Sequence, residues 1–406
     1  MKQLTRRRFI GNHLAAAAAG ALAVSSGAPA RAEGPAPKQK IKIGLIGCGG
    51  RANWLMPLLQ KHGGYELHAV ADYFQEEADK TGASFKVDAA RRFSGLSGYK
   101  RVLESGVEAV LIEDVPYFYP EQARDAVAAG CHVYMAKPIA VDVPGCLMVK
   151  AAGEAATAKK RCLLVDYQLP SDPAMVEIAK RVGEGALGRL AQVASFGLAW
   201  HAWPDPALTA NIESRLRGQI WLSDTALSGD TIVSYDIHII DGLLAVLGKT
   251  PVSACGISKT FRAKPNGDRT DVASALYEFD DGSVWNHLTQ CLDNNFDLPT
   301  LSASLFGMSA TAHIEYGGKV FIKGGEKHYV GEIGDVFTEG VERNIADFYR
   351  NIAEGHFENA TVPRAVNGTL AAILGREAAA RRQYLTMDAL IRENKRLETN
   401  LKGMKD

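Results

Sequence analysis

A glycine-rich turn near residue 47 is the clearest chemical pattern in the sequence. The apolar segment 41–46 runs into Gly47-Cys48-Gly49-Gly50-Arg51-Ala52, and a helical pattern follows. In a G-x-G-x-x-A turn the first glycine permits the tight bend, the second lets the backbone approach a pyrophosphate, and a small third residue lets helix and strand pack. The phosphates rest on amides of the helix N-terminus. An ordinary strand-to-helix turn is the alternative. We take these residues as candidate cofactor ligands: Gly47, Gly49, Gly50, Arg51 and Ala52.

A second apolar segment, 66–71, ends in Asp72. A carboxylate at the end of the second strand of such a unit accepts hydrogen bonds from the ribose hydroxyls. It also repels a 2′-phosphate, and no arginine immediately follows it. The sequence therefore predicts NAD as the cofactor in preference to NADP.

Ser234, His238 and Asp241 stand four and three residues apart in an apolar segment. A helix over 231–246 would place all three on one face, which we expect to look into a cleft. Imidazole suits proton transfer because its pKa lies near neutrality. A buried histidine satisfied by its neighbours is the alternative for His238.

The chain opens with an export pattern. Paired arginines within 6–8 precede Phe9, a weakly apolar alanine-rich run covers 14–24, and Ala30-Arg31-Ala32 offers a small-x-small cleavage site. This pattern is typical of a twin-arginine signal over 1–32, and a transmembrane anchor is the alternative. Proteins exported by this route fold first, often around a cofactor, and the location would be periplasmic.

Composition excludes several classes of protein. The 46 basic and 46 acidic residues balance, so nothing indicates nucleic acid or a membrane surface as a partner. The six cysteines are scattered, and neither C-x-x-C nor His/Cys spacing predicts a metal site. The length that remains after the signal suggests two domains.

Strand and helix patterns alternate up to about residue 166, which predicts an N-terminal doubly wound parallel sheet of the Rossmann type over 41–166, after an arm at 33–40. From 167 to 406 extended segments dominate and predict an α+β domain with a large, mostly antiparallel sheet. The expected strands are 41–46, 66–71, 107–112, 132–135, 162–166, 189–199, 252–257, 271–279, 284–291, 301–306 and 318–323. The expected helices are 51–62, 74–83, 119–129, 143–157, 231–246, 339–353, 364–381 and 387–397.

The order of these motifs resembles the glucose-fructose oxidoreductase and inositol dehydrogenase (Gfo/Idh/MocA) family. The resemblance spans the whole chain after the signal. It rests on the glycine turn, HVYMAKP at 132–138, Gly229-Asp230, DIHIID at 236–241, GALG at 185–188 and LTMD at 385–388.

The resemblance implies that Lys137 ends a strand beside the nicotinamide, where its ammonium holds the reacting hydroxyl, and that Pro138 fixes the turn that aims it. It implies His238 as general base or acid. Asp236 and Asp241 are the nearby carboxylates that could orient the ring, but Asp236 lies off the face, and Tyr235, three residues before His238, is an alternative proton carrier. This chain departs from the family at two positions. Ala136 replaces the usual Glu before the lysine, and Ser234 replaces an Asp common four residues before the histidine.

Two further clusters are candidate substrate contacts. Trp200 and His201 follow the first strand of the second domain, and indole faces suit stacking on a sugar ring, although filling the domain interface is the alternative. The second cluster, Asp166-Tyr167-Gln168, follows the last strand of the first domain, where family members place polar residues near the active site. We add Ser234 to this set.

Three functions follow from the resemblance. The first is a nicotinamide-dependent oxidoreductase acting on a secondary hydroxyl of a sugar, glycoside or cyclitol. The second is an NAD-dependent, redox-assisted glycoside hydrolase of the α-N-acetylgalactosaminidase kind. The third is a catalytically idle carbohydrate-binding relative, suggested by Ala136 and Ser234.

Assembly and cofactor retention complete the expectations. The uncovered face of the antiparallel sheet predicts a homodimer or homotetramer, with either Val272 and Leu276 or Ala273, Ala275 and Tyr277 facing the partner. An exported enzyme has no ready supply of soluble NAD, so we expect the cofactor to stay bound through turnover.

Overall fold

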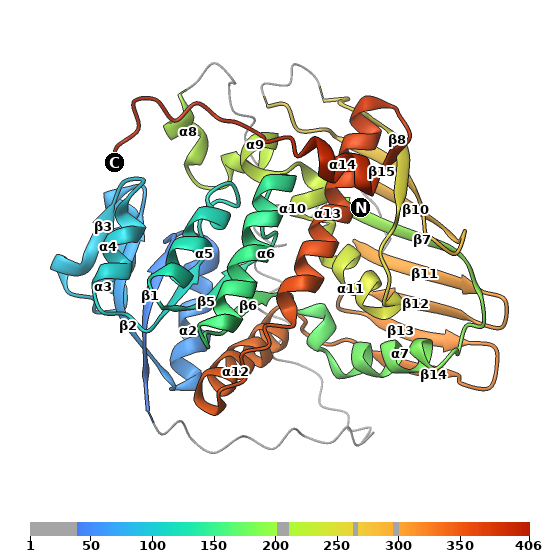
Figure 1. Cartoon of the computed structure of the whole chain (residues 1–406), viewed down its shortest axis with the longest axis horizontal. Helices are drawn as coiled ribbons and strands as arrows, with labels where there is room; N and C mark the ends of the chain where they lie inside the picture. The colour runs from blue at the N-terminus through green and yellow to red at the C-terminus, as the bar shows by residue number, and fades with distance from the viewer. Residues whose placement is uncertain (1–38, 201–210, 263–266, 295–299) are drawn as a thin grey trace, which may run out of the picture. The chain divides into compact units, whose positions relative to one another are not determined.

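The computed structural model describes residues 39–200, 211–262, 267–294 and 300–406 (Figure 1). The predicted signal at 1–32 and candidate residue His201 lie outside these ranges, as does most of the arm at 33–40.

The first half of the described chain is built on a six-stranded parallel sheet in the order β3-β2-β1-β4-β5-β6. Strands β1, β4, β5 and β6 are mostly apolar and almost wholly buried, as strands covered on both faces require, whereas the edge strand β3 is half-buried. The order reverses at β1 and β4, so their carboxyl ends flank the crevice in which doubly wound sheets bind ligands. The strands are β1 (Ile41–Ile46), β2 (Tyr65–Asp72), β3 (Arg92–Ser94), β4 (Ala109–Ile112), β5 (His132–Ala136) and β6 (Leu163–Asp166).

Helices cover both faces of this sheet. One face packs against α2 and α12 (Thr338–Glu354), and the opposite face packs against α5, α6 and α13 (Thr361–Arg381) (Figure 1). The helices of this half are α2 (Gly50–His62), α3 (Gln75–Ser84), α4 (Gly98–Glu104), α5 (Tyr119–Ala128) and α6 (Val143–Ala158), with a 3₁₀ turn at Ala89–Arg91.

The second half is built on a nine-stranded sheet in the order β14-β13-β12-β11-β7-β10-β9-β8-β15. The β7–β10 pair is parallel, and the other pairs are antiparallel. Both sheets agree with the predicted fold class. The strands are β7 (Leu190–Ala199), β8 (Ser253–Lys259), β9 (Val272–Glu278), β10 (Val284–Cys291), β11 (Leu301–Gly307), β12 (Thr311–Glu315), β13 (Lys319–Lys323), β14 (Tyr329–Glu332) and β15 (Leu385–Thr386).

A long buried helix, α13, joins the two sheets because it packs on β8 and β9 with one side and on α6 and β6 with the other. The remaining helices are α7 (Pro173–Gly183), α8 (Ile212–Leu216), α9 (Thr225–Ser228), α10 (Thr231–Ser234), α11 (Ile237–Leu247), α12 (Thr338–Glu354), α13 (Thr361–Arg381) and α14 (Met387–Glu393). Two 3₁₀ turns lie at Leu169–Ser171 and Ile220–Ser223.

The structure corrects the sequence prediction at two helices. The helix expected over 231–246 is two helices, α10 and α11, which meet at Tyr235. The helix expected to reach 397 ends at Glu393 because Asn394 takes a left-handed conformation with φ +46°. Within the described ranges, no helix is long and apolar enough to cross a membrane, and no group of three or more His, Cys, Asp or Glu is placed to hold a metal ion.

Candidate active site

The glycine turn has the geometry that a pyrophosphate needs. Gly47 has φ +90°, and a Cβ there would lie 2.5 Å from the backbone nitrogen of Asp114, so only glycine fits. A Cβ on Gly49 or Gly50 would meet no atom within 4 Å, which leaves room above the turn. Gly49 also gives α2 no side-chain cap. The first amides of α2 are therefore available to a phosphate, and the turn fits a dinucleotide.

Asp72 is fixed at the end of β2 by two backbone amides. Its Oδ2 accepts from the Cys48 amide at 2.8 Å and its Oδ1 from the Phe74 amide at 2.9 Å. Burial, with Asp114 nearby, raises the pKa of Asp72 to about 6. Above that pH a negative charge therefore stands beside the glycine turn, at the position expected for the adenosine ribose.

Arg51 spans a row of residues at the carboxyl ends of three neighbouring strands. Ala136 on β5 pairs with Asp166 on β6. Its neighbour Met135 pairs with Ile112 on β4, and Glu113 directly follows Ile112. The Arg51 Nε lies 3.0 Å from the Glu113 carboxylate, and its other end pairs with Asp166. The Arg51 side chain, predicted to help bind the cofactor, thus pairs with two carboxylates, while its backbone amide lies in the first turn of α2.

These neighbouring carboxylates bear on position 136, where this chain has alanine and related sequences usually have glutamate. The Glu113 side chain is fully buried, and burial raises its pKa to about 7, although Arg51 opposes that rise. Asn344 of α12 donates to Asp166 at 2.6 Å. The small Ala136 therefore stands between two carboxylates supplied by the neighbouring strands. Sequence reasoning named Asp166 only within a candidate substrate-contact cluster and missed Glu113, whose only signal was an acidic residue at the end of a buried strand.

Lys137 follows this row at the end of β5. Its Nζ donates to the Ser234 carbonyl oxygen at 2.7 Å. Burial, with Arg51 nearby, lowers the pKa of Lys137 to about 7, although Asp166, Asp236 and Glu113 act to raise it. The amine therefore changes charge near neutral pH. The Lys137–Pro138 peptide bond is cis.

His238 at the start of α11 is held by a tyrosine. Its Nδ1 lies 3.2 Å from the Tyr316 hydroxyl, which donates to Gln168 Oε1 at 3.2 Å. This network assigns the proton of the ring to Nδ1 and leaves Nε2 as an acceptor. Burial, with Lys137 and Arg51 nearby, holds the pKa of His238 well below its usual range. The imidazole is therefore neutral at physiological pH and can accept a proton at Nε2, which has no hydrogen-bond partner among the described residues.

The predicted shared face of Ser234, His238 and Asp241 does not form. The break at Tyr235 separates Ser234 from the helix that carries His238. The Asp241 carboxylate accepts a hydrogen bond from Arg364 of α13 at 3.1 Å. The His238 ring instead contacts the Tyr316 hydroxyl through Nδ1. In the ranges that the structure describes, no carboxylate hydrogen-bonds to the His238 ring. Asp241 is therefore a buried partner of Arg364. Tyr316, and not Asp241, orients the His238 ring.

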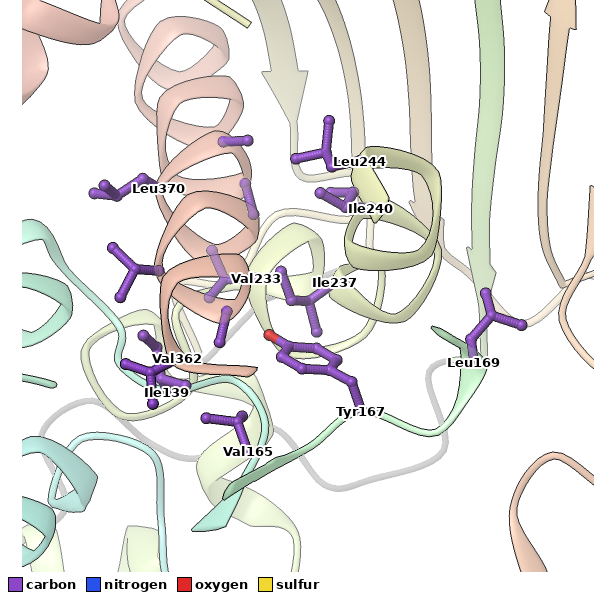
Figure 2. Close-up of a cluster of buried hydrophobic side chains, with 14 of the residues drawn as sticks. Ile139, Val165, Tyr167, Leu169, Val233, Ile237, Ile240, Leu244, Val362 and Leu370 are labelled. Atoms are coloured by element: carbon purple, nitrogen blue, oxygen red, sulfur yellow. The ribbon is translucent and has the colours of Figure 1, made fainter. Parts of the chain in front are cut away.

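Three other predicted residues lie in different settings. Tyr167 is buried in the hydrophobic cluster with Leu169 and Ile237, and its contact with a substrate stays a prediction (Figure 2). Burial raises the pKa of Tyr235 to about 12, so its hydroxyl keeps its proton and is a poor acceptor. Trp200 is 38% exposed at the end of β7, where stacking against a ligand stays a prediction.

Comparison with known sequences identifies the first domain. Residues 41–167 match the model of the GFO_IDH_MocA oxidoreductase family with its NAD-binding Rossmann fold. An uncharacterised oxidoreductase of Synechocystis is 23% identical over 226 residues, 56% of each chain. The inositol 2-dehydrogenase of Burkholderia ambifaria is 28% identical over 149 residues, which are 36% of this chain and 43% of the relative. The chain spans about half the length of these relatives.

Solved structures share the whole fold. The aldose-aldose oxidoreductase of Caulobacter crescentus, in complex with glycerol, matches with a TM-score of 0.69 at 18% identity, over 86% of this chain and 100% of its own. A levoglucosan dehydrogenase in complex with NADH and levoglucosan matches with a TM-score of 0.68 at 17% identity, also over 86% of this chain and 100% of its own. At these identities the likeness establishes the fold.

Proposed function

We propose that the chain is a nicotinamide-dependent oxidoreductase that moves hydride to or from a secondary hydroxyl of a sugar, glycoside or cyclitol, since residues 41–167 match the family model of the NAD-binding Rossmann fold of Gfo/Idh/MocA oxidoreductases. The observation that carries this proposal is the meeting of Lys137 and His238 beside Arg51 of the glycine turn. The Lys137 Nζ donates to the carbonyl oxygen of Ser234, four residues before His238, and the charges of Lys137 and Arg51 act to lower the pKa of the imidazole. A cation and a neutral base together match the needs of alcohol oxidation.

The two residues divide the work at the hydroxyl group. Bound nicotinamide supplies or accepts the hydride. His238 Nε2 takes the hydroxyl proton, because its lone pair is free and its Nδ1 proton is held by Tyr316. The Lys137 ammonium donates to the hydroxyl oxygen and stabilises the negative charge that develops there. The Ser234 carbonyl, 2.7 Å from Nζ, aims the amine.

The cofactor that this site favours is NAD. Asp72 is anchored by two amides and carries a charge above about pH 6, so a 2′-phosphate beside it would be repelled. The pyrophosphate belongs on the amides of Gly49, Gly50 and Arg51 at the start of α2.

Export and retention of the cofactor belong to the same proposal. Residues 1–32 carry the twin-arginine pattern, so the protein would fold around NAD, cross the membrane with it and work in the periplasm as a dimer or tetramer. Regeneration in place would then use a second sugar as hydride acceptor or a redox-neutral elimination. Protein purified without added nucleotide should release about one equivalent of NAD on denaturation, whereas none, with activity that depends on added NAD, would contradict retention.

A substrate panel tests the activity. The purified protein is incubated with sugars, glycosides and cyclitols while the absorbance of the reduced nicotinamide and the products are followed together. We expect reduced cofactor or an oxidised sugar with the wild type and with Lys150→Met, an exposed lysine on α6, but not with Lys137→Met. Aglycone release without net reduction would favour the hydrolase, and no turnover with any substrate would favour the idle relative.

A further inference from the structure

The segment after α14 crosses from the second domain to the carboxyl edge of the parallel sheet (Figure 1). Asn394 ends the helix, and the chain then passes over the N-terminus of α6, where the Leu397 amide donates to Asp142 Oδ2 at 2.8 Å. Residues 395–406 form neither helix nor strand, so these contacts fix their path.

The far end of this segment is bonded to the loops that follow β2 and β3. The Leu96 amide donates to the Lys405 carbonyl at 2.9 Å, and the Lys405 amide donates to the Tyr73 hydroxyl at 3.2 Å. Gly95 has φ +86°, and a Cβ there would lie 2.4 Å from the Asp406 carbonyl oxygen. The approach of the two backbones therefore requires glycine at 95.

Apolar side chains hold the middle of the segment. Leu401 and Met404 pack against a small hydrophobic cluster that includes Phe74 and Val115, the residues that lie just beyond β2 and β4. Burial of these two side chains supplies a hydrophobic anchor between the two sets of hydrogen bonds.

An open cavity of about 180 Å³ lies under this segment. Asp72, Tyr73 and Asp114 line it from the ends of β2 and β4, and Leu401 and Asp406 line it from the segment itself. The carboxyl ends of β1, β2 and β4 surround the crevice of the doubly wound sheet, on the side of the glycine turn that is away from Lys137.

We propose that residues 399–406 form the outer wall of a pocket for the adenosine half of the cofactor and slow its release. This inference rests on the proposed function, because it assigns the cavity to a dinucleotide. The wall adds Leu401 as an apolar contact and Asp406 as an acidic group opposite Asp72, so it favours a neutral adenosine with a free 2′-hydroxyl. While the bonds of Lys405 to Leu96 and Tyr73 hold, the segment covers one side of the nucleotide and thereby opposes its dissociation.

Ligands that contain only one half of NAD test whether the segment contacts the adenosine half. A full-length protein and a variant that stops after Glu398, which keeps the Leu397 anchor, are titrated with NAD, ADP-ribose and nicotinamide mononucleotide. We expect the truncation and Leu401→Ala to weaken NAD and ADP-ribose by roughly tenfold or more and to leave nicotinamide mononucleotide unchanged. Dissociation of NAD should become faster by a similar factor. Glu398→Ala, an exposed position in the same segment, serves as the control and should bind like the wild type.

The outcomes separate this inference from the function on which it rests. If the full chain binds NAD and both variants bind NAD and ADP-ribose with unchanged affinity, the wall is wrong and the cofactor assignment stands. Tighter binding after truncation would show that the segment obstructs the pocket, which also overturns the wall. If the full chain binds neither NAD nor ADP-ribose, both proposals fail. Leu401→Ala keeps the test valid should the truncated chain fold poorly.

Discussion

The amine of Lys137 lies 2.7 Å from the carbonyl oxygen of Ser234, and this hydrogen bond joins the first residue after β5 to the last residue of α10. One partner belongs to the parallel sheet and the other to the segment that leads into His238. The bond therefore helps to fix the position of Lys137 relative to the segment that carries His238. Because the carbonyl is a neutral acceptor, the amine keeps a partner whether or not it is protonated.

Loss of either catalytic side chain should abolish turnover without loss of cofactor. Lys137→Met removes the amine and keeps the length of the side chain, and His238→Ala removes the acceptor Nε2. Turnover should fall by about a hundredfold or more in each, the scale of a lost positioned proton carrier. Nucleotide titration should give wild-type affinity, since neither residue belongs to the phosphate turn. A near-normal rate for His238→Ala across the pH range would exclude it as the base.

Much of this site could be predicted from the sequence, because it depends on local patterns. The glycine turn, the strand that ends at Lys137 and the segment of His238 each lie within a short run of residues. The Arg51, Glu113 and Asp166 row could not be predicted, because its members come from three separate elements and only the strand order brings them together.

The helix break at Tyr235 escaped prediction for a different reason. Asp236 Oδ2 is 2.9 Å from His287 Nε2 and 2.5 Å from Thr289 Oγ1, both on β10. These buried tertiary bonds hold the start of α11 against the sheet and override the local helical pattern. Orientation of His238 by Tyr316 was likewise invisible, because Tyr316 follows a strand 78 residues away in sequence.

Activity should decline as the pH rises through about 7. The Lys137 pKa is lowered to about 7, so the ammonium that polarises the hydroxyl is present below that pH and is lost above it. The pKa of His238 lies well below its usual range, so His238 is neutral throughout and adds no opposing rise near neutrality. The pH profile of kcat/KM measures this directly. A rate that instead increases through pH 7 would mean that the neutral Lys137 amine acts as the base.

Restoring the family's glutamate at position 136 should destabilise this protein. Ala136→Glu adds a third carboxylate between Glu113 and Asp166. Both of these carboxylates already pair with the single guanidinium of Arg51. We expect a loss of at least about 2 kcal/mol in the free energy of unfolding, measured by denaturant titration. Ala136→Gln, with the same shape and no charge, is the control. Equal losses in both variants would assign the effect to side-chain volume and not to charge.

The outer face of the nine-stranded sheet should mediate self-association. On β9 Ala273, Ala275 and Tyr277 are buried, so Leu276 and its alternate neighbours face outward. Leu276 and Leu288 are each 42% exposed there, beside the outward-facing Phe196. Apolar exposure of this kind is typical of an interface. Light scattering at micromolar concentration should show a dimer or tetramer.

A charge on this face should disrupt the assembly. Leu288→Glu places a carboxylate at the centre of the proposed interface and should shift the protein toward monomer. Val176→Glu changes a residue of similar exposure on α7, away from the sheet face, and should leave the assembly intact. A wild-type monomer, or equal effects of both variants, would count against the interface.

Asp72 should make the preference for NAD depend on pH. The carboxylate repels a 2′-phosphate only when it is charged, and its pKa is about 6. Discrimination against NADP should therefore be weak below pH 6 and should strengthen as the pH rises through that value. Titration with both cofactors at several pH values measures the ratio. Asp72→Ala should narrow the ratio at neutral pH and remove its pH dependence, whereas Glu154→Ala, an exposed change on α6, should alter neither. Because the two Asp72 oxygens also hold the Cys48 and Phe74 amides, the alanine variant should weaken NAD as well, and tighter binding of NADP than of NAD by the wild type would refute the assignment.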